Sequence, residues 1–228
     1  SDDEAFVPEP FSLLYQRSVY QGMQTLTRKT IRTLRKNLKK IPEEYRDEAK
    51  GIVGSQKKIL TRMQKILKRK ISAMKVRIHG DYHLGQVLYT GKDFTIIDYE
   101  GEPARSIGER RLKHSPFKDV AGMIRSFHYV AYGALLLRSS VRHEDIVALE
   151  PWIEPWYRTV SGLYLTSYLK TVADAGFVPR KKTELEILLE TFLLEKAAYE
   201  LGYELNNRPG WVLIPLRGMQ YVLKNRKM

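Results

Sequence analysis

Short β-prone runs occur in one stretch of this sequence, and long helical patterns lie on both sides of that stretch. The runs are Val76–Ile78, Val87–Tyr89 and Phe94–Ile97. Between the last two, residues 90–93 read Thr-Gly-Lys-Asp, a composition typical of a tight turn. The sequence therefore predicts a mostly α-helical fold with one small β-hairpin between two helical blocks.

The helical patterns are long and amphipathic. Apolar residues recur at spacings of three and four from Phe11 to Leu38, which predicts one long helix. Pro42 interrupts this pattern and suits the first turn of a second helix, expected to run to about Met74 and to form an antiparallel hairpin with the first. Helical spacing resumes after Pro116. Further helices are expected over residues 151–174, 182–206 and 215–226.

Positive charge is concentrated in the first helical block. The chain has 228 residues and a formal net charge of +13, and the segment from Arg17 to Arg77 holds 19 Lys and Arg against 4 Asp and Glu. The rest of the chain is nearly neutral. A solvated helix face explains such a segment better than a nucleic-acid site does, while docking to a partner domain or an acidic surface stays open.

Several classes of protein are excluded by composition. The chain contains no cysteine, which rules out disulfides, cysteine-ligated zinc and a thiol nucleophile. Its longest apolar run, near Ala134–Leu137, is far too short for a transmembrane helix. Residues 1–9 are acidic, the opposite of the basic start of a signal peptide. A cytoplasmic protein without a membrane segment is expected.

Two polar loops adjoin the predicted hairpin. Residues 79–86 read His-Gly-Asp-Tyr-His-Leu-Gly-Gln and precede its first strand, while residues 98–103 read Asp-Tyr-Glu-Gly-Glu-Pro and follow its second strand. The geometry of a hairpin brings both loops to the same end of the sheet. We therefore expect Asp81, Gln86, Asp98 and Glu100 to converge there, on a loop with rigid support.

Such a set of oxygen-bearing side chains suits phosphoryl transfer. The reaction needs an Asp that orients the attacking hydroxyl and accepts its proton, together with amide and carboxylate oxygens that hold Mg²⁺ on the nucleotide phosphates. Kinases place an Asn or Gln five residues after that Asp, and a second Asp after a hairpin. Here the three residues are Asp81, Gln86 and Asp98.

Together the two loops resemble those of the aminoglycoside-phosphotransferase-like kinases, and specifically the maltokinases. Stretches within residues 8–18, 119–127 and 195–204 agree with maltokinases as well, so the resemblance covers nearly the whole chain. It implies the carboxy-terminal lobe of a protein-kinase-like fold. It also implies transfer of a phosphoryl group from ATP to the anomeric hydroxyl of maltose, giving maltose 1-phosphate for α-glucan (glycogen) synthesis.

The resemblance also implies roles for single residues. Asp81 would be the catalytic base, Gln86 and Asp98 would ligate Mg²⁺, and Glu100 would be a further metal ligand or would support one. Two more side chains would lie close to the phosphates or the acceptor: His83 and Arg105. Asp119 is expected to anchor the metal-binding loop or to cap the helix that follows it.

A helix near the carboxy terminus is the candidate acceptor site. Lys196, Tyr199 and Tyr203 are spaced i, i+3, i+7 and share one helix face. Aromatic rings stack on sugars and Lys donates to hydroxyl groups, which suits a disaccharide. On periodicity alone, the tyrosines are better explained as residues at the edge of a core, and the family resemblance is what favours a sugar-binding role.

One part of a maltokinase has no counterpart in this sequence. Nothing resembles the amino-terminal lobe, which supplies a β-sheet, a phosphate-binding lysine and a cover over the adenine. We therefore expect one carboxy-terminal lobe over residues 1–228, inactive alone: a basic helical hairpin (1–75), the catalytic and metal loops (76–105) and a helical acceptor-binding part (106–228). The missing lobe and trehalose synthase, to which many maltokinases are fused, are the partners that the resemblance implies.

Two other functions remain open from the sequence. A kinase of the same superfamily could act on an aminoglycoside, choline or homoserine, although a polycationic acceptor would prefer an acidic pocket to one containing Lys196. A non-enzymatic module could instead dock a partner through the basic helices. The intact set of Asp81, Gln86 and Asp98 argues against a purely structural role.

Overall fold

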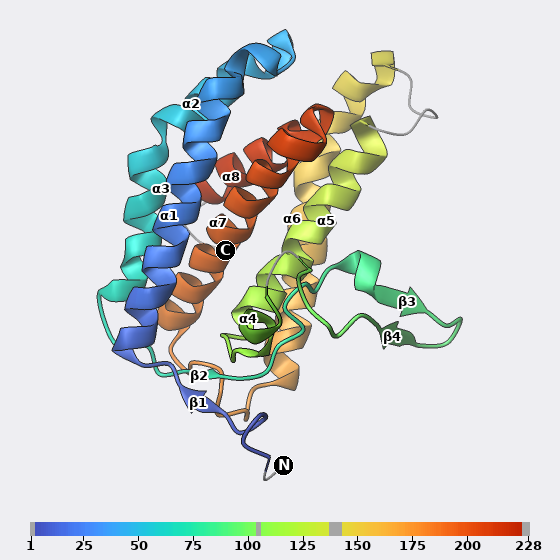
Figure 1. Cartoon of the computed structure of the whole chain (residues 1–228). Helices are drawn as coiled ribbons and strands as arrows, with labels where there is room; N and C mark the ends of the chain where they lie inside the picture. Colours follow the sequence, from blue (N-terminus) through green and yellow to red (C-terminus); the bar gives the residue numbers. More distant parts are fainter. Residues whose placement is uncertain (1–2, 104–105, 137–142, 225–228) are drawn as a thin grey trace. The chain divides into compact units, whose positions relative to one another are not determined.

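The computed structural model describes residues 3–103, 106–136 and 143–224 (Figure 1). The chain divides into two compact units. We call Ser1–Pro8 with Val76–Val178 the loop unit, and Glu9–Lys75 with Pro179–Met228 the bundle unit. The described part is mostly helical, as predicted, while the predicted single lobe over residues 1–228 stays a prediction. No described helix is long and apolar enough to span a membrane.

The bundle unit packs helices from both ends of the sequence around one core. Its helices are α1 (Leu13–Asn37), α2 (Arg46–Gly54), α3 (Gln56–Met63), α7 (Lys182–Asn207) and α8 (Leu213–Lys224), with 3₁₀ turns at Leu38–Lys40, Glu43–Tyr45, Gln64–Leu67 and Pro209–Trp211. α1 packs along α7 and α3. Buried apolar side chains such as Met23, Leu34, Ile59 and Leu201 fill the core. This burial supplies most of the unit's hydrophobic stabilisation.

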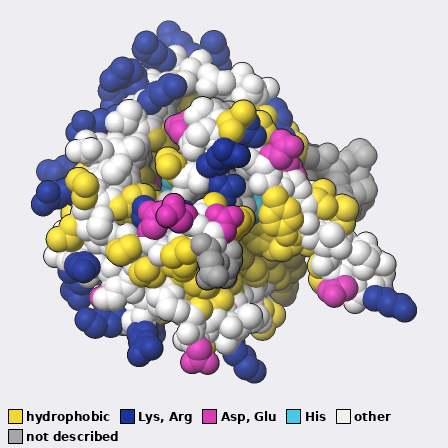
Figure 2. Space-filling view, turned by 60° about the horizontal axis from the view of Figure 1, so that its bottom comes forward, with side chains coloured by type: hydrophobic (Ala, Val, Ile, Leu, Met, Phe, Trp, Pro, Cys, Tyr) yellow, Lys and Arg dark blue, Asp and Glu magenta, His cyan; other side chains and the backbone are white. Residues whose placement is uncertain are grey.

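The cationic segment identified in the sequence lies on the outside of this unit. On α1, Arg28, Arg32 and Arg35 are exposed, and Lys57 and Lys58 are exposed on α3. Figure 2 shows Lys and Arg side chains, in dark blue, gathered along the side where α1 and α3 lie in Figure 1. The exposure agrees with a solvated helix face.

The second predicted helix is shorter and more broken than expected. Ser55 separates α2 from α3, and its hydroxyl donates to the carbonyl of Gly51 over 2.8 Å, competing with the regular helical pattern. The last turn ends at Leu67 instead of near Met74. After it, the buried Gln16 accepts from the Ile71 amide (3.1 Å) and donates to the carbonyls of Ile66 and Arg69 (2.8 Å to the latter). These bonds satisfy the backbone of a non-helical segment.

That segment leads into a small sheet that the sequence did not predict. Strands β1 (Glu9–Pro10) and β2 (Met74–Lys75) pair antiparallel, with Glu9 opposite Lys75. Lys75 Nζ lies 2.7 Å from a Glu9 carboxylate oxygen. Two-residue strands give no detectable alternation of apolar and polar residues, so the pattern that predicts longer strands is missing here. Val76 then makes only an isolated bridge with His114 instead of the expected strand.

The loop unit contains the predicted hairpin and two long helices. Strands β3 (Val87–Tyr89) and β4 (Phe94–Ile96) pair antiparallel with Val87 opposite Ile96, and the Thr90 amide donates to the Asp93 carbonyl across the turn. The helices are α4 (Ile107–Arg111), α5 (Phe117–Leu136) and α6 (His143–Thr171). α5 and α6 lie side by side, and the hairpin projects away from them (Figure 1).

α6 begins earlier than its proline residues suggest. A helix was expected from residue 151, yet α6 starts at His143 and continues through Pro151 and Pro155. Each proline removes one backbone hydrogen bond from the helix. Ile153 and Tyr157, one turn apart, are both buried, and this packing favours a continuous helix despite the prolines. The other predicted helices, over α1, α5, α7 and α8, are confirmed to within a few residues.

Candidate functional site

A carboxylate in the first turn of α5 holds the loop at residues 79–86. Asp119 Oδ2 accepts from the His79 amide over 2.7 Å, and Oδ1 accepts from the Gly80 amide over 3.0 Å. Burial raises the pKa of the Asp119 carboxyl, and the two amide hydrogen bonds oppose that rise. Asp119 was expected to anchor the metal-binding loop or to cap α5. It anchors the loop at residues 79–86 instead, because its oxygens accept from the amides of His79 and Gly80.

The same loop lies directly on the surface of α5. A Cβ atom added at Gly122 would be 2.5 Å from the Tyr82 carbonyl oxygen, so only glycine allows this approach. One turn further, Ser126 Oγ accepts from the Leu84 amide over 3.2 Å and donates to the Met123 carbonyl over 2.7 Å. α5 therefore supports the loop at three successive points, one in each turn.

His79 connects the loop at residues 79–86 to the loop after the hairpin. Its Nε2 lies 2.8 Å from the Ile97 carbonyl oxygen, and its Nδ1 lies 3.4 Å from the Asp81 amide. If Nδ1 accepts from that amide, the ring proton is on Nε2 and is donated to Ile97. The ring also packs between Tyr82 and Tyr99, with centroids 5.6 and 5.3 Å away. His79 thus supports both loops, a role that residue spacing alone does not indicate.

Two glycines let these loops pass close to each other. Gly80 and Gly101 both have a positive φ, at 87° and 80°. A Cβ at Gly101 would lie 3.1 Å from the His79 carbonyl oxygen, and one at Gly80 would lie 3.6 Å from the Cα of Gly101. The backbones of the two loops are therefore in contact at a point where a side chain would separate them.

The hairpin brings two of the predicted metal ligands together. The Ile97 amide donates to the Gln86 carbonyl over 3.0 Å, which extends the β3–β4 register by one residue. Beyond it, Gln86 Nε2 donates to Asp98 Oδ2 over 2.8 Å. Asp98 has a φ of +62°, a left-handed conformation that Asp adopts more readily than most residues. This turn of the backbone sets the carboxylate beside the amide of Gln86.

Asp81 and Glu100 have different neighbours. Asp81 Oδ2 lies 3.7 Å from His83 Nε2, and the Asp81 side chain is 18% exposed. Glu100 is 86% exposed, and a guanidinium nitrogen of Arg110 on α4 lies 3.9 Å from its carboxylate. Within the described ranges, no three His, Cys, Asp or Glu side chains are grouped closely enough to hold a metal ion. Of the four residues expected to converge, Gln86 and Asp98 are in contact, while Asp81 lies beside His83 and Glu100 beside Arg110.

The Gln86–Asp98 pair fits a hard divalent cation. Mg²⁺ prefers oxygen ligands and keeps several water molecules, so one carboxylate and one amide oxygen suffice as protein ligands. Gln86 presents its NH₂ group to Asp98. A half-turn of the Gln86 amide exchanges its nitrogen and oxygen, which occupy nearly the same volume. The amide oxygen then faces the Asp98 side, where it can serve as a metal ligand. The donor set is therefore compatible with magnesium.

The predicted acceptor residues lie in the bundle unit, on α7. Lys196 Nζ is 5.4 Å from the centroid of the half-buried Tyr199 ring, a cation–π distance. Tyr203 is 46% exposed and has the Arg208 guanidinium 5.4 Å from its ring centroid. The three residues share the predicted helix, with Lys196 and Tyr199 in contact. Arg105, which was expected beside the phosphates or the acceptor, lies outside the described residues.

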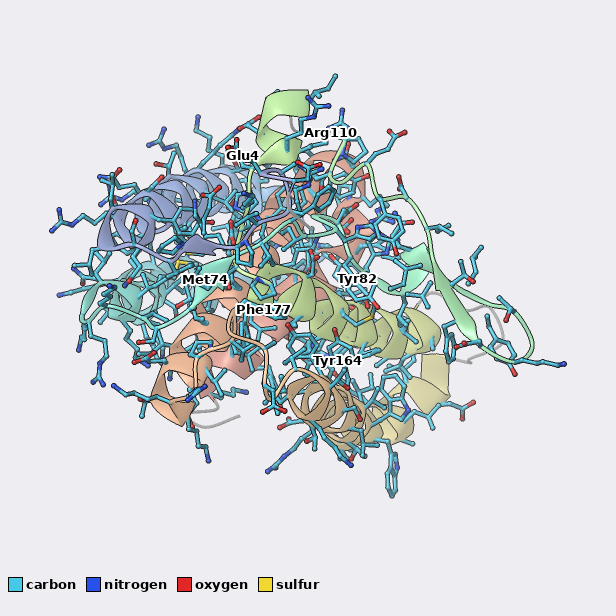
Figure 3. The ribbon with its side chains drawn as sticks, turned by 90° about the horizontal axis from the view of Figure 1, so that it is seen from below. Glu4, Met74, Tyr82, Arg110, Tyr164 and Phe177 are labelled. Atoms are coloured by element: carbon cyan, nitrogen blue, oxygen red, sulfur yellow. The ribbon has the colours of Figure 1, made fainter. Side chains whose placement is uncertain are left out.

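A tyrosine group near Asp119 was missed by the sequence analysis. Burial raises the pKa of Tyr168 to about 12, and the negative charge of Asp119 adds to the rise. Burial likewise raises the pKa of Tyr164, with the neighbouring Tyr82 contributing. Figure 3 labels Tyr82 on the loop and Tyr164 on α6. The spacing of Tyr164 and Tyr168, one helical turn apart, was the available signal for this group.

Comparisons of the sequence with curated proteins find glucosamine kinases. A glucosamine kinase of Streptacidiphilus jiangxiensis is 26% identical over 151 residues, which cover 66% of this chain and 32% of that protein. One from Mycolicibacterium smegmatis is 44% identical over 142 residues, covering 60% of this chain and 32% of that protein. The matched part is thus about a third of each relative's length. No family model matches the sequence.

Solved structures of glucosamine kinase show the same fold. One crystal form superposes with a TM-score of 0.77 at 19% sequence identity, over 96% of this chain and 49% of that one. A complex of glucosamine kinase with glucosamine, ADP and inorganic phosphate gives a TM-score of 0.75 over 96% of this chain and 50% of that one. The chain therefore has the fold of about half of a glucosamine kinase, and the expected kinase-like fold is confirmed at that level.

Proposed function

We propose that the whole gene product containing this sequence transfers the γ-phosphoryl group of ATP to a hydroxyl group of a sugar. The observation that carries the proposal is the arrangement of the two loops. Asp81 lies on a loop fixed to α5 by Asp119, and the adjoining hairpin pairs Gln86 with Asp98. The sequence relatives named glucosamine kinase, and a structural neighbour of that name solved with glucosamine, ADP and inorganic phosphate, support the same reaction class.

In this proposal Asp81 orients the attacking hydroxyl and accepts its proton. Its position depends on the support that Asp119 gives to the backbone of residues 79 and 80. Gln86 and Asp98 would hold Mg²⁺, which when bound neutralises charge on the nucleotide phosphates. Glu100 would support the metal site from its exposed position beside Arg110. His83 and Arg105 remain proposed neighbours of the phosphates or the acceptor.

The first candidate acceptor is maltose, phosphorylated at its anomeric hydroxyl to maltose 1-phosphate. The Lys196–Tyr199 pair supports a neutral sugar, because the ammonium offers N–H donors to sugar hydroxyl groups and the ring offers an apolar surface, while neither supplies a negative charge for a cationic acceptor. The product would then serve α-glucan synthesis. Trehalose synthase and an amino-terminal kinase lobe are proposed partners of the same activity, as the maltokinase resemblance implies.

Glucosamine is the second candidate, favoured by the relatives that the comparisons find. An amino sugar carries an ammonium group, which binds best beside a carboxylate. It would therefore need a negatively charged neighbour in place of Lys196. The two acceptors thus make opposite demands on the charge of the pocket.

The test is acceptor profiling with the purified whole gene product. ATP and MgCl₂ are incubated with maltose, glucosamine, glucose, kanamycin, choline or homoserine, and ADP release is measured. Phosphorus NMR then identifies the product. We expect one sugar to give the highest kcat/KM, with maltose 1-phosphate as the product if maltose is the acceptor. Turnover restricted to choline or homoserine, or to none of these acceptors, would contradict the proposal.

A further inference from the structure

We propose that His83 is a positioning residue that holds the Asp81 carboxylate by directing its Nε2–H at Asp81 Oδ2. This inference rests on the proposed function, in which Asp81 is the base. The two side chains leave the same loop two residues apart, and the atoms Nε2 and Oδ2 are 3.7 Å from each other. His83 is 36% exposed and Asp81 18%, so the imidazole is the more exposed of the two side chains.

The hydrogen bonds of the ring decide where its proton is. His83 Nδ1 accepts from the Gly85 amide over 3.0 Å, as the cap of the short 3₁₀ turn at Leu84–Gln86. A nitrogen that accepts a hydrogen bond uses its lone pair, so the proton of a neutral imidazole must be on Nε2. Nε2 is the atom that faces Asp81. The 3.7 Å separation is longer than a hydrogen bond, so the positioning role requires the Asp81 carboxylate to move toward the ring that Gly85 holds in place.

Gly85 is what allows the ring to take this position. A Cβ atom at Gly85 would be 2.8 Å from Cε1 and 2.9 Å from Nδ1 of His83. Any other residue would push the imidazole away from the Gly85 amide and so remove the contact that fixes its proton. The sequence His-Leu-Gly at 83–85 is thus a unit in which glycine seats the ring and the ring faces Asp81.

The position of this proton distinguishes a positioning role for His83 from a role as a base. With its proton on Nε2, His83 donates toward Asp81 and cannot take up the proton that Asp81 receives at that atom. It therefore favours one orientation of the ionised carboxylate and leaves the base role to Asp81. A residue that instead bound the nucleotide phosphates would act on the KM for ATP. The positioning role acts on kcat.

The kinetic test uses variants of the whole gene product with its best acceptor. We expect His83→Leu to lower kcat about tenfold, the value of one hydrogen bond to a charged group, without changing the KM for ATP. His83→Gln places an N–H near the former Nε2 and should restore most of kcat. Gly85→Ala keeps the imidazole but displaces it and should fall between wild type and His83→Leu. Gly108→Ala is the matched control, because its Cβ meets open space.

A second measurement does not need activity. Long-range ¹H–¹⁵N NMR spectra of the labelled protein, assigned by loss of signals in His83→Gln, should show that the neutral form of the His83 ring carries its proton on Nε2. A ring protonated on Nδ1 would overturn the inference, as would a raised KM for ATP with unchanged kcat in His83→Leu. If the wild-type protein phosphorylates no acceptor, the proposed function fails, while the NMR result still decides which ring nitrogen of His83 carries the proton.

Discussion

The amide of Gln86 donates a hydrogen bond to the carboxylate of Asp98 over 2.8 Å. Gln86 directly precedes β3 and Asp98 follows β4, so the bond joins the two chain segments at the open end of one hairpin. Eleven residues separate them in sequence, and the antiparallel register of β3 and β4 brings them together. The left-handed backbone of Asp98 turns its side chain toward Gln86. A short hairpin thus assembles a candidate magnesium site from two loops.

Asp98→Asn should weaken metal use while leaving the fold intact. Asn tolerates a positive φ about as well as Asp, so the backbone at +62° is preserved. The half-saturating Mg²⁺ concentration should rise by about tenfold or more, since losing even a supporting contact typically costs a metal site about 10–100-fold in affinity. A Mg²⁺ titration of kcat measures the change. An unaltered Mg²⁺ dependence would remove Asp98 from the metal site.

Gly122→Ala should destabilise the protein. The new Cβ would lie 2.5 Å from the Tyr82 carbonyl oxygen, so the loop must move off α5, and overpacking of this kind costs about 1–3 kcal/mol. Gly162→Ala, on α6 with open space at its Cβ, is the matched control and should be neutral or stabilising by up to about 1 kcal/mol. Urea unfolding of both variants measures the difference. Equal stabilities would show that the loop does not depend on this contact.

Sequence patterns predicted the elements that depend on residues close together in the sequence. The hairpin at 87–96 and the neighbouring positions of Gln86 and Asp98 follow from a turn composition and a register. The support from Asp119 could not be predicted in the same way. It joins an α5 side chain to loop amides 39 and 40 residues away, which no periodicity reports.

The early end of the second helix and the β1–β2 pair were missed for a related reason. Gln16 satisfies the backbone of residues 66–71 from a helix about 50 residues earlier in the chain. Such a tertiary contact overrides the helical pattern that continues through Met74. Glu100 was grouped with Asp98 because the hairpin was expected to bring both loops to one end of the sheet, yet its exposed carboxylate lies 3.9 Å from Arg110 on α4.

Tyr168→Phe should reduce the loss of stability at alkaline pH. The pKa of Tyr168 is about 12 in the folded protein and about 10 in an unfolded chain, so the folded state keeps the phenol proton longer. The contribution of the protonated Tyr168 phenol to folding stability is fully present below pH 10 and is lost as the pH rises toward 12. Thermal unfolding at pH 8 and pH 11 should show a smaller decrease in Tm for the variant than for wild type. The same decrease in both proteins would contradict the assignment.

Tyr199→Ala separates a sugar-binding role from a packing role. If Lys196 and Tyr199 bind the acceptor, the variant should lose about 1–3 kcal/mol of binding free energy for the sugar. The KM for the sugar should rise by the corresponding factor, with the KM for ATP unchanged. If the ring only packs, the variant should instead lose stability, by up to about 3–5 kcal/mol for a fully buried aromatic, and lose activity toward every substrate. Kinetics on both substrates and one melting curve distinguish these outcomes.

The most direct test of the account is the turnover of Asp81→Asn in the whole gene product. Transfer of labelled γ-phosphoryl from ATP to the best sugar acceptor is measured alongside the melting temperature. We predict an unchanged melting temperature and a loss of turnover of roughly 10²–10⁴-fold, the usual contribution of a general base. A variant that folds normally and turns over at the wild-type rate would contradict the assignment of Asp81 as the base.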